Sequence, residues 1–266
     1  MSTTNPQPED SILLVKREGF VATLTFNRPV VLNAIDVPMA RALRDASRQC
    51  ACDRSIRAIV LCGAGNGFMA GGDLATLSAD PAQGASDLLD PLNEALTHFA
   101  NMDAPLIAKV HGVAAGAGMS LMMQADFVVA AEKTRFNLAY INIGASCDVG
   151  ASWFLPRQVG LRRALEISML GETMQVDEAL RIGLVNRVVP AAELDADVMA
   201  LAHRLAAGPT VALGHMRRLM RSSLDRDLPE QLEAEKAAFL DCAQSRDFRS
   251  GVDAFFAKQP AQFLGH

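Results

Sequence analysis

The sequence of 266 residues has few aromatic side chains: 12 Phe, one Trp and one Tyr make up 5% of it. Half of its residues are nevertheless hydrophobic, so Ala, Val, Leu, Ile and 12 Met have to fill the core. This composition excludes a disordered chain. It predicts one large α/β domain, or a domain with a small appendage, packed from small side chains. The single Tyr is Tyr140 and the single Trp is Trp153.

Long uncharged segments are also missing. The longest stretch without Asp, Glu, Lys or Arg, residues 110–125, is too short and too rich in Gly and Ala to span a membrane. The first ten residues show no basic segment leading into an apolar one, so we expect no signal peptide. The net charge is -5 and there is no basic run. We therefore expect neither a membrane nor a nucleic acid as a partner.

Cysteine is scarce and its number is odd: the chain has Cys50, Cys52, Cys62, Cys147 and Cys242. A chain of this length needs no disulfides to hold its core, so reduced thiols in a cytoplasm are expected. Two of the cysteines are separated by one residue, but no His or second Cys pair lies at zinc spacing. The sequence thus predicts a cytoplasmic protein without a metal site.

Hydrophobic patterns predict strands and helices in alternation up to Pro190. The predicted strands are residues 12–16, 21–26, 58–62, 106–110, 127–130 and 184–189, and the predicted helices begin after Asp36, cover residues 88–99 and cover residues 119–124. Beyond Pro190 the apolar residues recur only at helical spacing. We therefore expect an α/β core over residues 1–190 and a helical C-terminal region over residues 191–266. Such a tail often packs against a neighbouring subunit.

Two glycine-rich turns, residues 63–73 and 112–118, each follow a predicted buried strand and lead toward a helix. Glycine lets the backbone approach a ligand closely, and the start of a helix presents unpaired N–H groups. Two such turns can direct N–H groups at one developing oxyanion. A single turn of this kind is more often a tight connection. Neither turn has the Lys-Ser or Lys-Thr pair of a phosphate-binding loop.

The turns carry a family resemblance. The segment Phe68-Met-Ala-Gly-Gly-Asp-Leu74 resembles the oxyanion loop of the crotonase (enoyl-CoA hydratase/isomerase) superfamily, and His111 to Leu121 resembles its second signature. Three further segments are similar to the family: residues 27–34, 183–186 and 251–258. The resemblance implies a crotonase-like spiral of ββα repeats with a helical C-terminal region. It also implies trimers that often pair into hexamers, and an acyl-CoA thioester substrate whose coenzyme A replaces any separate cofactor.

The resemblance assigns the two oxyanion-hole donors to the backbone N–H groups of Ala70 and Ala117. The other residues expected to bind substrate are Arg28, Val31, Gly71, Gly72, Asp73, Leu74, Gly116, Ser120, Tyr140, Trp153, Phe255 and Lys258. Among these, Asp73 is expected to brace the first turn. Tyr140 and Trp153 are expected to line the space for the acyl group.

The coenzyme A contacts implied by the resemblance come from both ends of the chain. Arg28 and Lys258 would meet its phosphates, and Phe255 would lie against the adenine. Exposed basic residues are equally often a solvated surface. In addition, Val30 and Val31 stand where the family usually has a basic residue, so part of this contact is missing.

The acid–base groups, not the fold, set the chemistry. Hydratases of the family hold a water between two glutamates, and the corresponding residues here are Ser120 and Tyr140. Neither is an efficient general base near neutral pH. Asp148 instead resembles the proton-shuttling Asp of isomerases similar to the phenylacetate-pathway ring-type isomerase. The resemblance therefore implies that β,γ-enoyl-CoA is isomerised to α,β-enoyl-CoA with Asp148 as the base.

Other interpretations remain open. The chain could be a hydratase with a non-standard acid or base, an aryl-CoA dehalogenase with Asp148 as nucleophile, or a catalytically silent acyl-CoA-binding protein. From spacing alone, Asp148 would more often cap a helix that begins near Gly150. Residues 75–89 are expected to form a mobile loop that sets acyl specificity. We expect a solvated or intersubunit face from Arg217, Arg218 and Arg221.

Overall fold

The computed structural model describes residues 11–78 and 80–266. The first ten residues, on which the signal-peptide prediction depends, lie outside this range. The strands are β1 (Leu13–Glu18), β2 (Val21–Phe26), β3 (Ala58–Gly63), β4 (Leu106–Val110), β5 (Val113–Ala115), β6 (Phe127–Ala131), β7 (Arg135–Asn137), β8 (Met174–Gln175) and β9 (Arg187–Val189). The α-helices are α1 (Val37–Cys52), α2 (Pro81–Asn101), α3 (Ala117–Met123), α4 (Ala151–Val159), α5 (Leu161–Leu170), α6 (Val176–Arg181), α7 (Leu194–Ala206), α8 (Thr210–Ser222), α9 (Leu228–Gln244) and α10 (Arg246–Ala257).

Two sheets organise these elements. The larger sheet has the order β1-β2-β3-β4-β6-β9, and the smaller one has the order β5-β7-β8. In the larger sheet only the β1–β2 pair is antiparallel. The chain passes twice from the larger to the smaller sheet, from β4 to β5 and then from β6 to β7, and α3 follows β5. This is the predicted spiral of ββα repeats.

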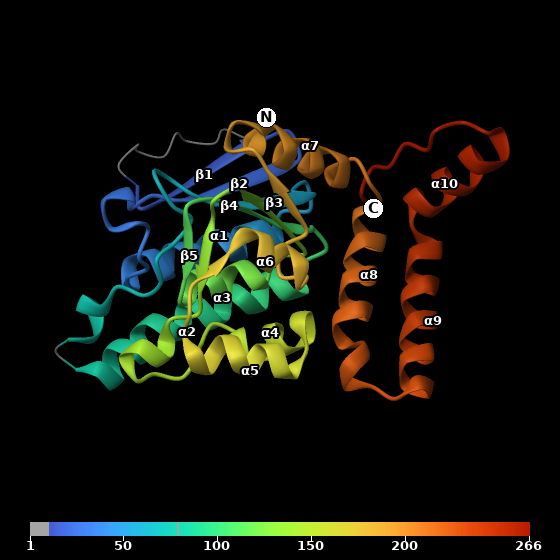
Figure 1. The fold of residues 1–266 in the computed structure, drawn as a ribbon. Coiled ribbons are helices and arrows are strands. Elements are labelled where there is room, and N and C mark those ends of the chain that lie inside the picture. The colour runs from blue at the N-terminus through green and yellow to red at the C-terminus, as the bar shows by residue number, and fades with distance from the viewer. Residues whose placement is uncertain (1–10, 79) are drawn as a thin grey trace.

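Both faces of the larger sheet are covered. On one face Val60, Ile107 and Val129 pack against Val198 and Ala202 of α7. The other face belongs to the main core, to which α1, α2 and α3 contribute. Burial on both faces explains why β3 is an unbroken apolar run. Because α7 lies on the sheet, the first helix after residue 190 is part of the core (Figure 1).

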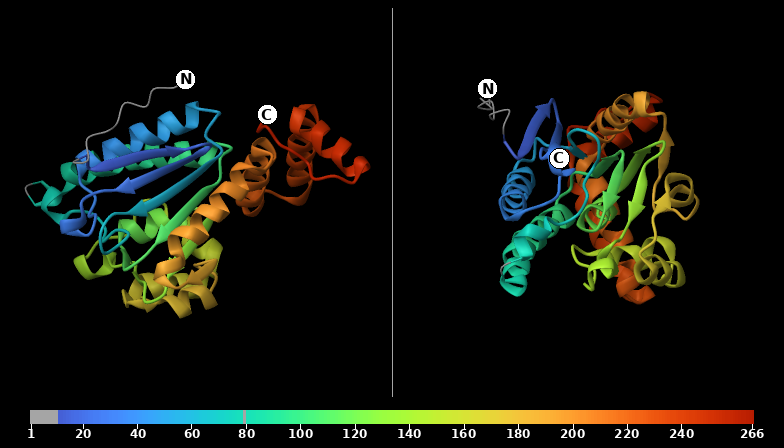
Figure 2. Two further views of the ribbon diagram at one scale, coloured as in Figure 1. Left: turned by 90° about the horizontal axis from the view of Figure 1, so that it is seen from above. Right: turned by 60° about the vertical axis from the view of Figure 1, so that its left-hand side comes forward.

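The last three helices extend from this body, as Figure 1 and the left view of Figure 2 show. Helix α8 is attached to the body through its arginines. Arg217 Nη1 lies 3.0 Å from Asp126 Oδ2, and Arg221 Nη2 lies 2.8 Å from Asp126 Oδ1. The side chain of Arg217 is only 7% exposed. The prediction of a solvated or intersubunit face was therefore wrong for these two residues, because their partner is a carboxylate of the core.

The segment predicted as a mobile loop, residues 75–89, is largely helical. Leu74–Leu77 form a short 3-10 helix, and α2 begins at Pro81. Asp80 accepts the Gln83 N–H at 3.1 Å and so caps the helix. Leu88 is buried in the main core. The cap, the first-turn proline and the apolar stripe together outweigh the small polar residues that suggested a loop.

Two kinds of feature are absent from the described residues. None of the helices within residues 11–78 and 80–266 is long and apolar enough to cross a membrane. In the same part of the chain, no three His, Cys, Asp or Glu residues are grouped so that they could hold a metal ion.

Candidate active site

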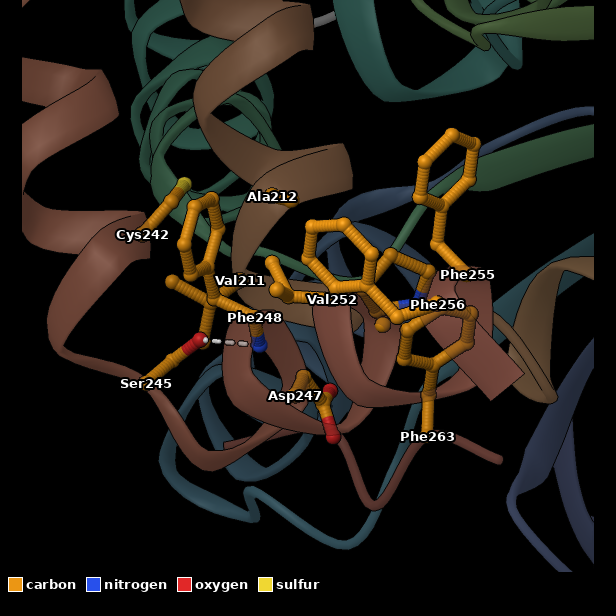
Figure 3. Close-up of a pocket in the computed structure, with 12 residues that line it drawn as sticks. Val211, Ala212, Cys242, Ser245, Asp247, Phe248, Val252, Phe255, Phe256 and Phe263 are labelled. Carbon is orange, nitrogen blue, oxygen red and sulfur yellow. Dashed lines mark hydrogen bonds between the residues drawn. The ribbon is translucent and has the colours of Figure 1, made fainter. Parts of the chain in front are cut away.

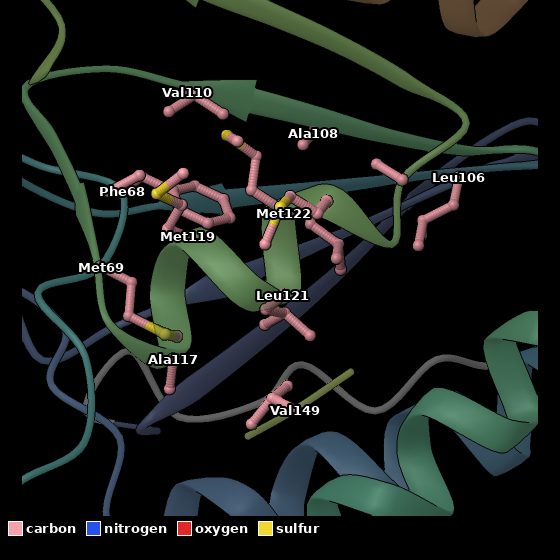
Figure 4. Packing of buried hydrophobic residues seen from close by; sticks show 14 of the residues in the cluster. Phe68, Met69, Leu106, Ala108, Val110, Ala117, Met119, Leu121, Met122 and Val149 are labelled. Atoms are coloured by element: carbon pink, nitrogen blue, oxygen red, sulfur yellow. The ribbon is translucent and has the colours of Figure 1, made fainter. Parts of the chain in front are cut away.

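The two glycine-rich turns meet where α3 begins. Met69 donates its N–H to Val113 O at 3.1 Å and accepts the Ala115 N–H at 2.9 Å. A β-carbon on Gly118 would lie 2.4 Å from Met69 O, so a residue without a side chain is needed there. Figure 4 shows the side chains of Met69 and Ala117 together at this end of α3. The first turn is thus held against the start of the helix by backbone bonds and by close packing.

The structure corrects one of the two predicted oxyanion donors. The N–H of Ala70 is donated to the carbonyl oxygen of Leu32 at 2.9 Å. This amide already has an acceptor within the chain and is not free for a substrate. No sequence pattern indicates this bond, because Leu32 is distant along the chain and has a left-handed backbone with φ 49°.

Gly72 is the better donor from the first turn. Gly71 O and Asp73 N both bond to Ile35, at 2.8 Å each. Successive backbone groups of an extended chain alternate sides, so the Gly72 N–H points away from Ile35. Among the hydrogen bonds of residues 11–78 and 80–266, none uses the N–H of Gly72 or of Ala117.

The second predicted donor, Ala117, lies close to this glycine pair. A β-carbon placed on Gly71 would be 3.7 Å from the Ala117 amide nitrogen. Gly71 has φ +113° and Gly116 has φ +48°, so both turns use backbone conformations that favour glycine. The arrangement therefore presents free N–H groups from two turns at one place.

Arg28 lies inside this framework. Its Nη2 is 3.1 Å from Asp73 Oδ2, and its Nη1 is 3.3 Å from Asp36 Oδ2. Asp73 also accepts the Ala75 N–H at 3.2 Å. The two carboxylates occupy the guanidinium, so the structure places Arg28 as a brace between chain segments. Asp73 thus bonds both to Arg28 and to the backbone at the start of the short 3-10 helix Leu74–Leu77.

A hydrogen-bonded chain of three side chains stands beside the second turn. Tyr140 donates its hydroxyl proton to Asp148 Oδ1. The Tyr140 oxygen lies 2.9 Å from Oγ of Ser120, which is fully buried on α3. The two residues that the family resemblance places at the hydratase glutamate positions are thus in contact with each other, and Tyr140 connects Ser120 to the carboxylate of Asp148.

Burial changes the acid–base properties of this chain. It raises the pKa of Asp148 above its ordinary value, and the hydrogen bond from Tyr140 partly opposes this effect. The pKa of Tyr140 is also raised, first by burial and then by the negative charge of Asp148. Tyr140 therefore keeps its proton near neutral pH, and Asp148 is a stronger base than an exposed aspartate.

The helix-cap interpretation of Asp148 does not hold. The residue before α4 is Gly150, with φ 77°, and the N-terminus has no side-chain cap. Within the described part of the chain, the only donor to the Asp148 carboxylate is Tyr140, and this donor binds Oδ1. Oδ2 is left without a protein donor.

The remaining predicted contacts are not brought to this place within one chain. Phe255 is 78% exposed and lines an apolar groove of about 450 Å³ with Phe248, Phe256 and Phe263 (Figure 3). Lys258 follows at the end of α10, on the extended helices.

Trp153 also lies elsewhere. The Arg157 guanidinium stacks 4.2 Å from its ring centroid, and the ring lines a groove beside Met216 and Met220 of α8. The prediction that it lines the acyl space is not supported by this position. Val31 and Leu74, in contrast, are 43% and 53% exposed. Leu74 directly follows the first turn, and Val31 precedes Leu32, whose carbonyl oxygen accepts the Ala70 N–H.

Sequence reasoning passed over Ile141 and Ile143, which follow Tyr140 in a short 3-10 helix, Tyr140–Ile143. They are 47% and 54% exposed. Large exposed apolar side chains next to a site are candidates for contact with an apolar ligand. Their only sequence signal was an Ile-x-Ile pattern that is equally typical of a strand.

Comparison with known proteins agrees with this geometry. Residues 16–266 match the family described as enoyl-CoA hydratase/isomerase. The chain is 36% identical over 252 residues to a "1,2-epoxyphenylacetyl-CoA isomerase" of Escherichia coli, covering 93% of this chain and 96% of that protein. It is 36% identical over 245 residues to a "Probable enoyl-CoA hydratase" of Rhodobacter capsulatus, covering 92% and 95%. A solved enoyl-CoA hydratase structure from Mycobacterium smegmatis has a TM-score of 0.89 at 32% identity, covering 95% and 98%. The chain therefore belongs to the enoyl-CoA hydratase/isomerase family and is an acyl-CoA enzyme with the crotonase fold.

Proposed function

We propose that this enzyme moves the double bond of an enoyl-CoA from the β,γ to the α,β position. The observation that carries the proposal is that Asp148 is the one carboxylate on the Ser120–Tyr140–Asp148 chain. One base is enough for a 1,3-proton shift, whereas the usual hydration route needs two carboxylates around a water. Ser120 and Tyr140 stand where those carboxylates would be.

The proposed reaction proceeds through a thioester enolate. Asp148 removes a proton from the α-carbon, and the electron pair of that C–H bond moves into a dienolate. The N–H groups of Gly72 and Ala117 stabilise the negative thioester oxygen, and each such donor is worth about 3 kcal/mol of transition-state stabilisation. Asp148 then returns the proton to the γ-carbon. The raised pKa of its carboxyl group favours proton removal.

The test uses a β,γ-enoyl-CoA and follows the absorbance of the conjugated product. We expect turnover by the wild type and a loss of about 10²- to 10⁴-fold in the Asp148→Asn variant, the usual range for a general base. Binding of the acyl-CoA should persist in the variant. An Asp148→Asn variant as active as the wild type would contradict the assignment of Asp148 as the base.

Hydration is the second candidate, because one relative of equal identity is named a probable hydratase. Incubation with crotonyl-CoA separates the two activities. Addition of water faster than isomerisation of the β,γ-enoyl-CoA would favour the hydratase. Binding without turnover of either substrate would instead indicate a silent acyl-CoA-binding protein.

We also propose that the chain assembles as a homotrimer or as a dimer of trimers. The extended helices support this, since Phe239, Phe255 and Phe256 are 62%, 78% and 78% exposed. If a neighbouring subunit covers this face, Phe255 and Lys258 of one subunit would lie near the substrate of its neighbour. Light scattering should give three or six times the chain mass, and a monomer would rule the proposal out.

A further inference from the structure

The hydroxyl groups of Ser120 and Tyr140 have more acceptors than protons. Ser120 Oγ lies 2.9 Å from Tyr140 Oη and 3.2 Å from the carbonyl oxygen of Gly116. Tyr140 also reaches Asp148 Oδ1. Each hydroxyl has a single proton to donate. The hydrogen bonds can therefore all point toward Asp148 or all point toward Gly116 O. The acceptors at the two ends, Asp148 and Gly116 O, decide which direction is adopted.

Ionised Asp148 fixes one direction. A carboxylate only accepts hydrogen bonds, so Tyr140 donates to it, and the charge strengthens that bond. With its proton used in this way, Tyr140 can only accept from Ser120. Ser120 then donates to Tyr140 and has no proton for Gly116 O.

Protonation of Asp148 allows the hydrogen bonds to take the opposite direction. Without the negative charge, Tyr140 is free to donate to Ser120, and Ser120 in turn donates to Gly116 O. The C=O of Gly116 and the N–H of Ala117 belong to the same conjugated peptide group. A hydrogen bond to the oxygen of that group polarises its N–H, because linked hydrogen bonds strengthen one another.

We propose that Ser120 and Tyr140 are positioning residues that couple the protonation of Asp148 to the donor strength of the Ala117 amide. The inference rests on the proposed function, in which Asp148 accepts the substrate proton. When the α C–H bond breaks, its proton goes to Asp148 and its electron pair goes to the dienolate. Negative charge leaves the carboxylate and develops on the thioester oxygen in the same step. The hydrogen bonds from Tyr140 and Ser120 then point toward Gly116 O instead of toward Asp148. The Ala117 N–H becomes a stronger donor at the moment when the oxyanion is present. Return of the proton to the γ-carbon restores the first direction.

The experiment measures the carbonyl stretching frequency of crotonyl-CoA, labelled with ¹³C at the thioester carbon, when it is bound to the full-length protein. Asp148→Asn supplies a neutral side chain that can donate to the Tyr140 oxygen. We compare its effect on the frequency with Ser120 present and in the Ser120→Ala background. Any direct effect of removing the Asp148 charge is common to both backgrounds and cancels in the difference.

We expect Asp148→Asn to lower the frequency at least twice as much with Ser120 present as in the Ser120→Ala background. Tyr140→Phe should abolish the extra shift in the same way, since it breaks the chain at another link. Ser47→Ala is the matched control, because Ser47 is also fully buried but bonds to Arg44 O and His98. This control should leave the extra shift intact.

If Asp148→Asn shifts the carbonyl frequency equally in the wild-type, Ser120→Ala and Tyr140→Phe backgrounds, the proposed coupling is wrong. Because Tyr140→Phe tests the same chain independently, a failure of Ser120→Ala to fold would leave the proposal open to refutation. The readout needs only binding, so it is separate from the proposed function. Loss of the coupling with normal isomerisation by the wild type would refute this inference alone. Wild-type protein that binds crotonyl-CoA but does not isomerise a β,γ-enoyl-CoA would refute the proposed function.

Discussion

Arg28 and Asp73 are 45 residues apart in sequence, yet Nη2 of one lies 3.1 Å from Oδ2 of the other. Their side chains are 22% and 24% exposed. Arg28 follows β2, and Asp73 directly follows Gly72, whose N–H is the donor proposed for the first turn. The ion pair therefore connects the segment after β2 to the placement of that donor.

We expect Arg28→Gln and Asp73→Asn to lower kcat by similar factors, about 10- to 100-fold, because small displacements of a catalytic group are costly. The double variant should be little worse than either single variant. KM for the acyl-CoA should change much less than kcat. Steady-state kinetics of the three variants check this.

Arg181→Gln is a suitable control, since Arg181 pairs with Glu178 on the exposed surface of α6, far in sequence from both glycine-rich turns. It should leave kcat unchanged. A direct role of Arg28 in binding coenzyme A phosphates predicts a different pattern. In that case Arg28→Gln alone would raise KM, and Asp73→Asn would not.

Tyr140→Phe should change the pH dependence of catalysis. The hydrogen bond from Tyr140 favours the ionised form of Asp148 and so lowers a pKa that burial has raised. Removal of the hydroxyl raises the pKa of Asp148 further. Because the ionised form is the base, the acid limb of kcat/KM should move to higher pH in the variant. Above that limb, the two enzymes should differ less.

The measurement is a pH profile of kcat/KM for the wild type and Tyr140→Phe, which reports ionisations of the free enzyme. A limb that moves to lower pH would contradict a hydrogen bond donated by Tyr140 to the Asp148 carboxylate. Ser47→Ala again serves as a control for the loss of a buried hydroxyl, and its limb should stay in place.

Local patterns predicted much of the fold. The bounds of β2 and β4 agree with the prediction at both ends, and Asp36 caps α1 through the Met39 N–H at 2.9 Å. Each of these depends on neighbouring residues. Helix α4 was expected only through the cap interpretation of Asp148, and α5 was not predicted; Pro156 lies inside α4, and Gly160 separates the two helices.

The parts of the site that sequence reasoning misplaced depend on distant partners. Ala70 was assigned a free N–H, which the carbonyl of Leu32 occupies. The Asp148 carboxylate accepts a hydrogen bond from Tyr140 and does not cap a helix. This bond depends on how the 3-10 helix Tyr140–Ile143 orients the Tyr140 ring. The family resemblance identified Asp148 as the candidate base, but its hydrogen bond from Tyr140 is known only from the structure.

Gly118 and Gly72 should respond differently to replacement by alanine. On Gly118 the new β-carbon would lie 2.4 Å from Met69 O and 2.7 Å from Met69 Cβ, so the backbone of the first turn has to move. We expect Gly118→Ala to lower the free energy of unfolding by about 1–3 kcal/mol, as overpacking does. Activity should fall with it, because the two turns separate.

Gly72→Ala is the matched control for stability. The nearest atom to its β-carbon would be Leu88 Cδ2 at 3.7 Å, an ordinary contact. The free energy of unfolding should be unchanged or slightly higher, since alanine restricts the unfolded chain. Denaturant unfolding of both variants checks the pair, and equal losses would show that the approach of Met69 to α3 is not the cause.

Arg217 should contribute far more to stability than a surface arginine or lysine. Its guanidinium bonds to Asp126 and to the carbonyl oxygens of Phe99, at 2.6 Å, and Ala100, at 3.1 Å. Arg217→Met leaves the two carbonyl oxygens without this donor in a buried place, and it removes one of the two arginines that pair with Asp126, the other being Arg221. We expect the free energy of unfolding to fall by about 3–5 kcal/mol, the usual cost of breaking a buried ion pair from one side.

Denaturant unfolding at several protein concentrations separates this loss from any effect on assembly. Lys236→Met is the comparison, because Lys236 and Glu233 form an exposed pair at 3.4 Å, with side chains 65% and 75% exposed. Such pairs contribute little, so this variant should unfold like the wild type. If Arg217 instead lay on a solvated face, as its sequence context suggested, the two variants would be equally stable. A large loss for Arg217→Met alone would show that the buried contacts of Arg217 attach α8 to the body.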